Sequence, residues 1–248
     1  MVVEDNTELR EYLSSILSSK YQILEAVDGM EGLQIARESI PDLILSDIAM
    51  PRVSGIELCR TIKNEMSTSH IPVILLTSRT STHDLIEGTE TGADNYITKP
   101  FDVQHLIVLI EKTIETRRKL YQRFSQDIYL MPNENFENDL DKKFLKEIIK
   151  YIDKNSSNSS ISVESLSAHL LMSRTNVYRK IKAITGQTAT EFIRSTLLKK
   201  AVKLIESRQY NISEIAFNLG FSSPGYFSKC FKEQYGKSPS EYLNSSNK

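Results

Sequence analysis

The sequence contains only two cysteines, little net charge and no long hydrophobic run. Cys59 and Cys230 stand alone, without the spacing of metal ligands, which argues against a disulfide framework and against a zinc site. No apolar run approaches the roughly 18 residues that a membrane span requires. No charged and then apolar leader opens the chain either. We therefore expect a cytoplasmic protein.

The net charge of −1 conceals a strong asymmetry between the two halves of the chain. Residues 1–140 contain 13 Lys and Arg against 23 Asp and Glu, a balance of −10. Residues 141–248 contain 18 against 9, a balance of +9. A basic half of this kind points to an anionic partner, most often nucleic acid. At 248 residues the chain is long enough for two domains, each with its own core.

Short apolar runs alternate with amphipathic stretches through the first half, which is typical of βα units around a parallel sheet. The expected strands are 1–3, 22–26, 43–47, 73–77 and 95–98, and the expected helices are 7–19, 28–38, 55–66, 83–91 and 102–120. This alternation predicts an α/β domain, a doubly wound (βα)5 sandwich. Only three residues precede Glu4, whereas a mean strand has about 5–6 residues. We infer from this short first strand an excised piece, or the tail, of a longer polypeptide.

Polar residues stand at the C-terminal ends of these strands. Glu4 and Asp5 follow the first strand and Asp47 closes the third, while Thr77 and Lys99 come 30 and 52 residues after Asp47. Because open α/β sheets bind ligands at the carboxyl ends of their strands, these side chains should converge on one rim. Crowded carboxylates repel, and a hard divalent cation such as Mg²⁺ relieves the repulsion through oxygen ligands. A carboxylate beside that cation can act as a nucleophile toward a phosphoryl group, and the cation and a lysine can stabilise the transferring oxygens.

Residues 1–120 resemble the receiver domain of two-component response regulators, on the segment DIAMP at 47–51, Gly55, and GADNYITKPF at 92–101. The resemblance implies a flavodoxin-like receiver fold in which Asp47 is the phosphoacceptor. Lys99 would pair with the phosphoryl group, and Thr77 and Tyr96 would be coupled switch residues. The resemblance also implies a Mg²⁺ site whose ligands are Glu4, Asp5, Asp47 and the backbone carbonyl of Ala49.

The pattern changes after residue 120. Residues 121–140 are polar and aperiodic around Pro132, and we expect a linker there, centred on 125–139, with an extension of the last helix leading into it. Residues 141–153 have apolar side chains at a helical spacing. Two similar segments follow, 163–182 and 212–233, and each reads as a short helix, a tight turn and a second helix with an N-cap serine. This is a helix-turn-helix present twice, joined by a helix over 190–207 that would be roughly 27 Å long.

Residues 141–243 resemble the AraC-type DNA-binding domain, which makes the second domain, 141–248, all-α with tandem helix-turn-helix units. The resemblance rests on SRTNVYRKIK at 173–182, Gly186, FIR at 192–194, Ile215-Ala216 through Gly220-Phe221, YFSKCFK at 226–232, Gly236 and SPSEY at 238–242. In the first recognition helix Val177 and Ile181 should point inward. The expected DNA contacts there are Arg174, Thr175, Asn176, Tyr178, Arg179 and Lys182. Arg179 can make a bidentate contact to guanine, whereas Arg174 and Lys182 suit phosphates.

The second recognition helix offers fewer hydrogen-bonding side chains, because Pro224 and Gly225 occupy positions where the AraC family often has base-contacting residues. The expected contacts there are Ser223, Tyr226, Ser228 and Lys229. For His169 we prefer the reading of a helix-surface imidazole.

Together these features indicate a transcription regulator of a two-component system, controlled by phosphorylation. Its partners would be double-stranded DNA, a histidine kinase, and a second copy bound through the receiver after phosphorylation. An alternative is the C-terminal receiver and DNA-binding tail of a hybrid sensor histidine kinase. Two weaker alternatives are an aspartyl phosphatase with its own substrate, and constitutive DNA binding with a relic receiver. We expect no enzyme activity beyond self-phosphorylation and self-dephosphorylation.

Overall fold

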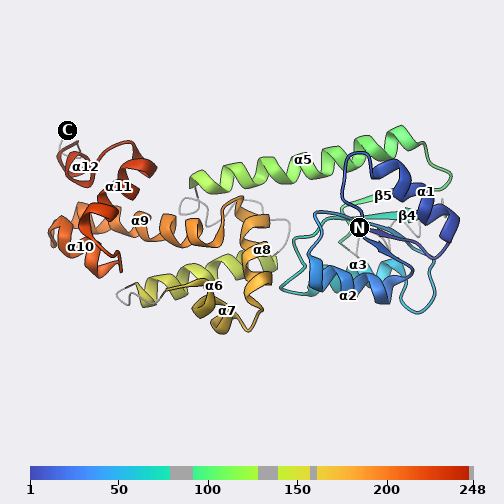
Figure 1. The fold of residues 1–248 in the computed structure, drawn as a ribbon, viewed down its shortest axis with the longest axis horizontal. Helices are drawn as coiled ribbons and strands as arrows, with labels where there is room; N and C mark the ends of the chain where they lie inside the picture. The colour runs from blue at the N-terminus through green and yellow to red at the C-terminus, as the bar shows by residue number, and fades with distance from the viewer. Residues whose placement is uncertain (79–91, 128–138, 157–160, 246–248) are drawn as a thin grey trace. The chain divides into compact units, whose positions relative to one another are not determined.

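The structure, a computed structural model, describes residues 1–78, 92–127, 139–156 and 161–245 (Figure 1). Its backbone divides into two compact units. The first unit comprises Met1–Lys142 together with the short segment Ala183–Gly186. The second unit comprises Lys143–Lys182 and Gln187–Lys248. No helix within the described residues is both long and apolar enough to span a membrane.

The first unit is built on a parallel sheet of five strands in the order β2-β1-β3-β4-β5. The strands are β1 (Val2–Val3), β2 (Glu25–Ala26), β3 (Ile44–Asp47), β4 (Val73–Thr77) and β5 (Asn95–Thr98). All pairings are parallel, and β3 and β4 are buried along their whole length. The doubly wound α/β fold predicted from the alternation of strands and helices is therefore confirmed.

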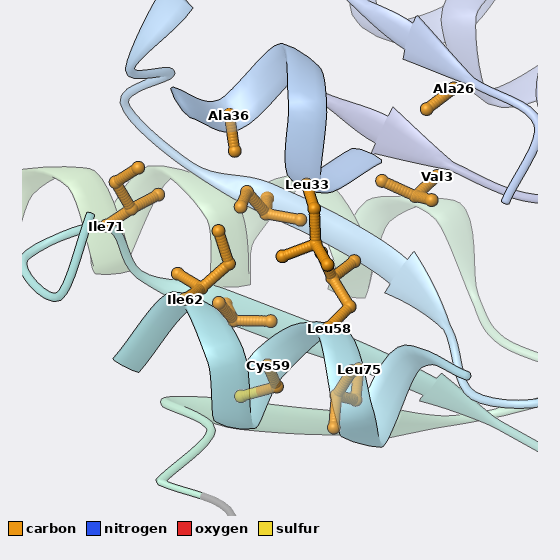
Figure 2. Close-up of a cluster of buried hydrophobic side chains, with 11 residues drawn as sticks. Val3, Ala26, Leu33, Ala36, Leu58, Cys59, Ile62, Ile71 and Leu75 are labelled. Carbon is orange, nitrogen blue, oxygen red and sulfur yellow. The ribbon is translucent and has the colours of Figure 1, made fainter. Parts of the chain in front are cut away.

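Helices cover both faces of this sheet (Figure 1). Helices α2 (Gly29–Ser39) and α3 (Gly55–Asn64) pack on one face, around a core that includes Leu33, Leu58 and Ile62 (Figure 2). Helices α1 (Thr7–Leu17) and α5 (Val103–Asp127) pack on the other face, around a core that includes Leu13 and Leu106. Because successive strand residues point to opposite faces, Leu75 joins the first core and Leu76 the second.

Capping residues decide where these helices begin. Asn6 caps α1, Asp28 caps α2, and Ser54 forms a capping box with Glu57 at the start of α3. The helix predicted over 83–91 lies outside the described residues.

Helix α5 is longer than its predicted end near residue 120, and it occupies 121–127 of the expected linker. No proline or glycine interrupts Val103–Asp127. The next helix begins at Asp139, so the linker expected over 121–140 is helical at both of its ends. The rest of that linker lies outside the described residues.

The second unit is entirely helical over its described residues. Its helices are α6 (Asp139–Asn155), α7 (Val163–Leu170), α8 (Arg174–Thr185), α9 (Ala189–Ser207), α10 (Ile212–Asn218), α11 (Pro224–Tyr235) and α12 (Pro239–Ser245). The pairs α7–α8 and α10–α11 lie at the two ends of α9 (Figure 1). With 19 residues, α9 is roughly 28 Å long. The predicted repeat of two helix pairs on one connecting helix is confirmed, and α12 is a further helix that the sequence pattern did not predict.

Candidate acidic site and nucleic-acid interface

Strand pairing brings the polar residues together at the carboxyl edge of the sheet. Val3 pairs with Ser46, so Glu4 and Asp47 leave neighbouring strands at the same level. Asp47 in turn pairs with Leu76, one residue before Thr77. Thr77 pairs with Thr98, the residue before Lys99. Residues that are far apart in the sequence therefore meet on one rim, as predicted.

Lys99 links two of the three carboxylates. Its Nζ lies 2.9 Å from Glu4 Oε2 and 2.9 Å from Asp47 Oδ1. One carboxylate oxygen from each of Glu4, Asp5 and Asp47 falls within 4.8 Å of the others. Glu4 and Asp47 are buried while Asp5 is exposed. Three carboxylates this close form an oxygen-donor set that suits a hard divalent cation.

Burial and the charge of Asp47 make the site unfavourable for the carboxylate of Glu4. Burial raises the pKa of Glu4 above its ordinary value, and the neighbouring Asp47 charge adds to this, although the hydrogen bond from Lys99 opposes it. Burial opposes the charge of Lys99, but hydrogen bonds to Glu4 and Asp47 outweigh it and raise the pKa of Lys99. Lys99 therefore stays protonated, and it neutralises only part of the negative charge.

The carboxylates open into a pocket of about 560 Å³. The residues that line it are Glu4, Asp5, Asn6, Glu8, Leu9, Tyr12, Asp47, Ser78 and Lys99. Leu9 and Tyr12 were not predicted, although they lie three residues apart on the helix that starts just after the acidic pair, a spacing that puts both on one face. Ser78 follows Thr77 and was also missed.

The other predicted receiver residues do not line this pocket. Thr77 is buried at the end of β4. Tyr96 is half-buried in β5 and packs against the core on the α2–α3 face. Ala49 is exposed in the loop after β3. The peptide bond between Lys99 and Pro100 is cis.

A second ion-pair cluster lies at the opposite edge of the sheet and was not predicted. Asp94 stands just before β5, and its carboxylate lies 2.6 Å from Lys63 Nζ of α3 and 2.9 Å from Arg117 Nη2 of α5. Its Oδ2 also accepts a hydrogen bond of 2.7 Å from the backbone N–H of Val73. Despite burial, these two cations lower the pKa of Asp94. The cluster ties two helices to the sheet on opposite faces, and no sequence pattern relates its residues.

In the second unit, α8 presents most of the predicted contact residues. Arg174, Thr175, Tyr178, Arg179 and Lys182 are exposed, and Asn176 is half-buried. Val177 and Ile181 are fully buried, which confirms that they point inward. Arg174 Nη1 lies 2.7 Å from Glu164 Oε1 of α7, so DNA would compete with an ion pair for this guanidinium.

Lys180 is the unexpected residue of α8, because it is fully buried. Its Nζ lies 5.0 Å from the centre of the Phe144 ring in α6, a cation–π distance. Lys180 is three residues from Val177 and therefore shares its inward face, a signal that was available in the sequence. Its four-carbon stem helps to fill the core between α6 and the recognition helix.

Helix α11 begins with a serine cap and a proline. Ser223 caps it by accepting a 3.2 Å hydrogen bond from the backbone of Tyr226, and Pro224 stands at its first position. Tyr226 and Lys229 are exposed, while Ser228 is half-buried. A hydrogen bond with the Tyr226 hydroxyl raises the pKa of Arg194 in α9.

His169 lies at the surface of α7, as predicted. Its ring packs 4.6 Å from that of Tyr151, and Nε2 lies 3.8 Å from Glu147 Oε2. Cys59 and Cys230 are both buried, and no disulfide joins them.

Comparison with protein families finds a match within each unit. Residues 1–111 match the family described as response regulator receiver domain. Residues 166–245 match a helix-turn-helix domain family. The two matches cover the acidic site and both helix pairs, apart from the first three residues of α7.

Individual relatives match the chain over different lengths. Histidine kinase P4 of Formosa agariphila is 42% identical over 244 residues, 98% of this chain and 18% of that protein. Response regulator ArlR of Staphylococcus aureus is 37% identical over 111 residues, 44% of this chain and 49% of ArlR. The chain thus spans about half of ArlR and a much smaller share of histidine kinase P4. A solved receiver domain of a signal transduction histidine kinase from Syntrophus aciditrophicus is 31% identical, with a TM-score of 0.45, and covers 54% of this chain and 93% of that one.

Proposed function

We propose that this chain, which joins a response regulator receiver domain to a helix-turn-helix domain of the AraC type, is a transcription regulator of a two-component system that is switched by phosphorylation of Asp47. The observation that carries the proposal is the convergence of Asp47, Glu4 and Lys99, with both lysine contacts at 2.9 Å. A carboxylate nucleophile held by a lysine in an open pocket suits phosphoryl transfer. The proposal includes no turnover of a substrate beyond self-phosphorylation and self-dephosphorylation.

The donor set fits Mg²⁺. Glu4, Asp5 and Asp47 would hold the cation with the backbone carbonyl of Ala49, and the three carboxylates already lie within 4.8 Å of one another. When bound, Mg²⁺ would supply positive charge that offsets carboxylate repulsion and stabilises phosphoryl oxygens.

The transfer itself needs few groups. An oxygen of the Asp47 carboxylate attacks the phosphorus of a phosphohistidine on the kinase, the P–N bond breaks, and the imidazole leaves with the electron pair. Lys99, already 2.9 Å from Asp47 Oδ1, donates hydrogen bonds to the phosphoryl oxygens. The product is an acyl phosphate, whose phosphoryl group carries about −1.5 to −2 charges in place of the single charge of the carboxylate, so the buried rim becomes more negative by up to about one charge.

The switch residues Thr77 and Tyr96 would respond to that new charge. The Thr77 hydroxyl would hydrogen-bond a phosphoryl oxygen and Tyr96 would turn inward, which changes the surface around β5 and α5. This surface would form a symmetric dimer. Two helix-turn-helix domains would then occupy adjacent DNA sites, with α8 reading bases and α11 making mainly phosphate contacts.

Intact mass after incubation with Mg²⁺ and a small-molecule phosphodonor tests the chemistry. One added phosphoryl group is expected in the wild type and none in the Asp47→Asn variant. Addition of phosphate to both proteins, or to neither even with a cognate kinase, would contradict the proposal.

A second candidate is favoured by one observation, the 42% identity to histidine kinase P4 across 98% of this chain. In this version the chain is one part of a hybrid sensor kinase, and the kinase core of the same polypeptide phosphorylates Asp47. Sequencing the gene upstream of the Met1 codon distinguishes the candidates: an open reading frame encoding a kinase core supports the hybrid protein, and a stop codon in that frame excludes it.

A further inference from the structure

An ion pair that the proposed mechanism does not use holds the loop between β3 and α3. Arg52 Nη2 of this loop pairs with Asp28 Oδ2, and the Asp28 side chain is only 2% exposed. The other oxygen, Asp28 Oδ1, accepts hydrogen bonds from the backbone N–H groups of Met30 at 2.8 Å and Glu31 at 3.0 Å. Asp28 therefore fixes the start of α2 with one oxygen and the loop with the other.

The backbone at Arg52 is strained. Its φ is 65°, in the left-handed region that non-glycine residues rarely adopt. The backbone N–H of Val53 donates to the carbonyl of Pro51 at 2.8 Å, so the chain reverses around Arg52 in a γ-turn. Such a conformation persists only where neighbouring groups hold it, and it is common at functional loops. The pairing with buried Asp28 is a contact that can hold it here.

Backbone contacts fix the rest of the loop. The N–H of Gly29 donates to the Val53 carbonyl at 3.2 Å, and a Cβ on Gly29 would lie 2.3 Å from that oxygen, so α2 and the loop meet backbone to backbone. At the root of the loop, Gly55 N–H donates to the Ile48 carbonyl at 3.0 Å. Ile48 N–H donates to the Leu76 carbonyl of β4, also at 3.0 Å. Ala49 therefore lies between a root anchored to the sheet and a far end anchored to α2.

We propose that Asp28 and Arg52 are positioning residues for the cation site: their ion pair holds residues 48–54, the loop that carries the Ala49 carbonyl two residues after Asp47. The inference rests on the proposed function, since it needs a hard divalent cation held by oxygen ligands. Groups that orient metal ligands typically change metal affinity 10–100-fold. Ala49 supplies one neutral ligand beside three carboxylates, so we expect the lower end of this range, about 10-fold.

Two variants break the pair in different ways. Arg52→Gly removes the guanidinium and places at this φ a residue that tolerates it. Asp28→Asn removes the charge but keeps a side chain that caps helices about as well as aspartate. The matched control is Arg37→Gln, which removes another arginine–carboxylate pair of the first unit, between Arg37 Nε and Glu65 Oε2 at 3.0 Å. The dissociation constant for Mg²⁺ is measured by titration calorimetry on the full chain, and urea unfolding in EDTA verifies that each variant is folded.

The expected result is a dissociation constant about 10-fold higher in both variants, with less than a twofold change in Arg37→Gln. The double variant should bind no more weakly than the weaker single variant, because both changes break one interaction. Unchanged Mg²⁺ affinity in Arg52→Gly and Asp28→Asn, or an equal loss in Arg37→Gln, would overturn the inference and leave the proposed function standing. A wild-type chain that binds no Mg²⁺ would overturn both.

Discussion

Glu4 is a residue of the acidic site whose negative charge suits a cation ligand but lowers the stability of the folded protein. Its pKa is raised, first by burial and also by the Asp47 charge, so the folded protein holds the charged form at a penalty. This penalty is absent below the ordinary pKa of 4.5, where Glu4 is protonated in both states, and it develops as the pH rises through the folded-state pKa.

Replacement of Glu4 by Gln should therefore stabilise the first unit at neutral pH in the absence of Mg²⁺. The gain should shrink as the pH falls through the raised folded-state pKa and should vanish below about 4.5, where wild type and variant carry the same charge at this position. Urea unfolding in EDTA at pH 7 and at pH 4 measures both differences. A variant that is less stable than the wild type at pH 7 would show that the bond to Lys99 outweighs the burial penalty.

Leu171 offers a stability test in the second unit. It ends α7 in the left-handed region, with φ 52°, and the residue is 93% exposed. At the matching position of the second helix pair the chain has Gly220, with φ 74°. A left-handed conformation costs an L-residue roughly 1–2 kcal/mol. A glycine avoids this cost, but its greater freedom in the unfolded chain lowers the stability by about half as much.

We therefore expect Leu171→Gly to stabilise the second unit by roughly 0.5–1 kcal/mol, measured by urea unfolding. Gly220→Ala is the converse control and should destabilise it. A loss of stability in Leu171→Gly would mean that the exposed leucine makes a contact that outweighs the backbone strain.

At the scale of elements, α8 is the proposed recognition helix, and its exposed and buried faces are both well defined. Arg179 is exposed on the side opposite the buried Val177 and Ile181. Arg179→Ala should weaken binding to the preferred DNA site by about 1–3 kcal/mol and relax specificity at one base pair. Lys182→Ala should instead weaken binding to all sequences and reduce its salt dependence. Fluorescence anisotropy with specific and random duplexes separates the two effects, and equal losses on both duplexes for Arg179→Ala would exclude base contact.

Helix α6 lies outside the matched helix-turn-helix region, 166–245, but its packing makes it part of the same unit. Phe144 is fully buried and its ring lies under Lys180 of α8. Phe144→Ala should destabilise the second unit by about 3–5 kcal/mol and weaken DNA binding, while phosphorylation of Asp47 is unchanged. Exposed Lys146 is the control, since its replacement by Ala should alter stability by no more than about 0.5 kcal/mol. A stable Phe144→Ala variant that binds DNA normally would show that α6 is dispensable.

At the scale of the whole molecule, phosphorylation of the acidic receiver would control the basic DNA-binding domain through a change of oligomeric state. Phosphorylated wild type should sediment as a dimer and bind a tandem site more tightly, whereas Asp47→Ala should remain a monomer under the same conditions. Sedimentation velocity with and without phosphodonor makes the comparison. Dimerisation of Asp47→Ala to the same extent as phosphorylated wild type would contradict this mechanism.

Much of the architecture followed from local pattern, because strand and helix periodicities are short-range properties of the sequence. Asp47, Thr77 and Lys99 could be placed on one rim since parallel strands share a direction, and Val177 could be turned inward from its helical spacing. The end of helix α5 was predicted near residue 120 because residues 121–127 are mostly polar and have no clean periodicity, although no proline or glycine ends the helix there. Lys180 was not predicted as buried because a charged residue reads as exposed unless its partner is known.

By itself, the amino-acid sequence determined the parallel α/β sheet, the paired helix-turn-helix units and the identity of the acidic residues at the strand ends. Only the tertiary structure decided which distant groups meet: Lys99 between Glu4 and Asp47, Asp94 between Lys63 and Arg117, and Asp28 with Arg52. The physical reason is that backbone periodicity is encoded within a few neighbouring residues, whereas an ion pair depends on the separation of atoms that strand order and helix packing bring together.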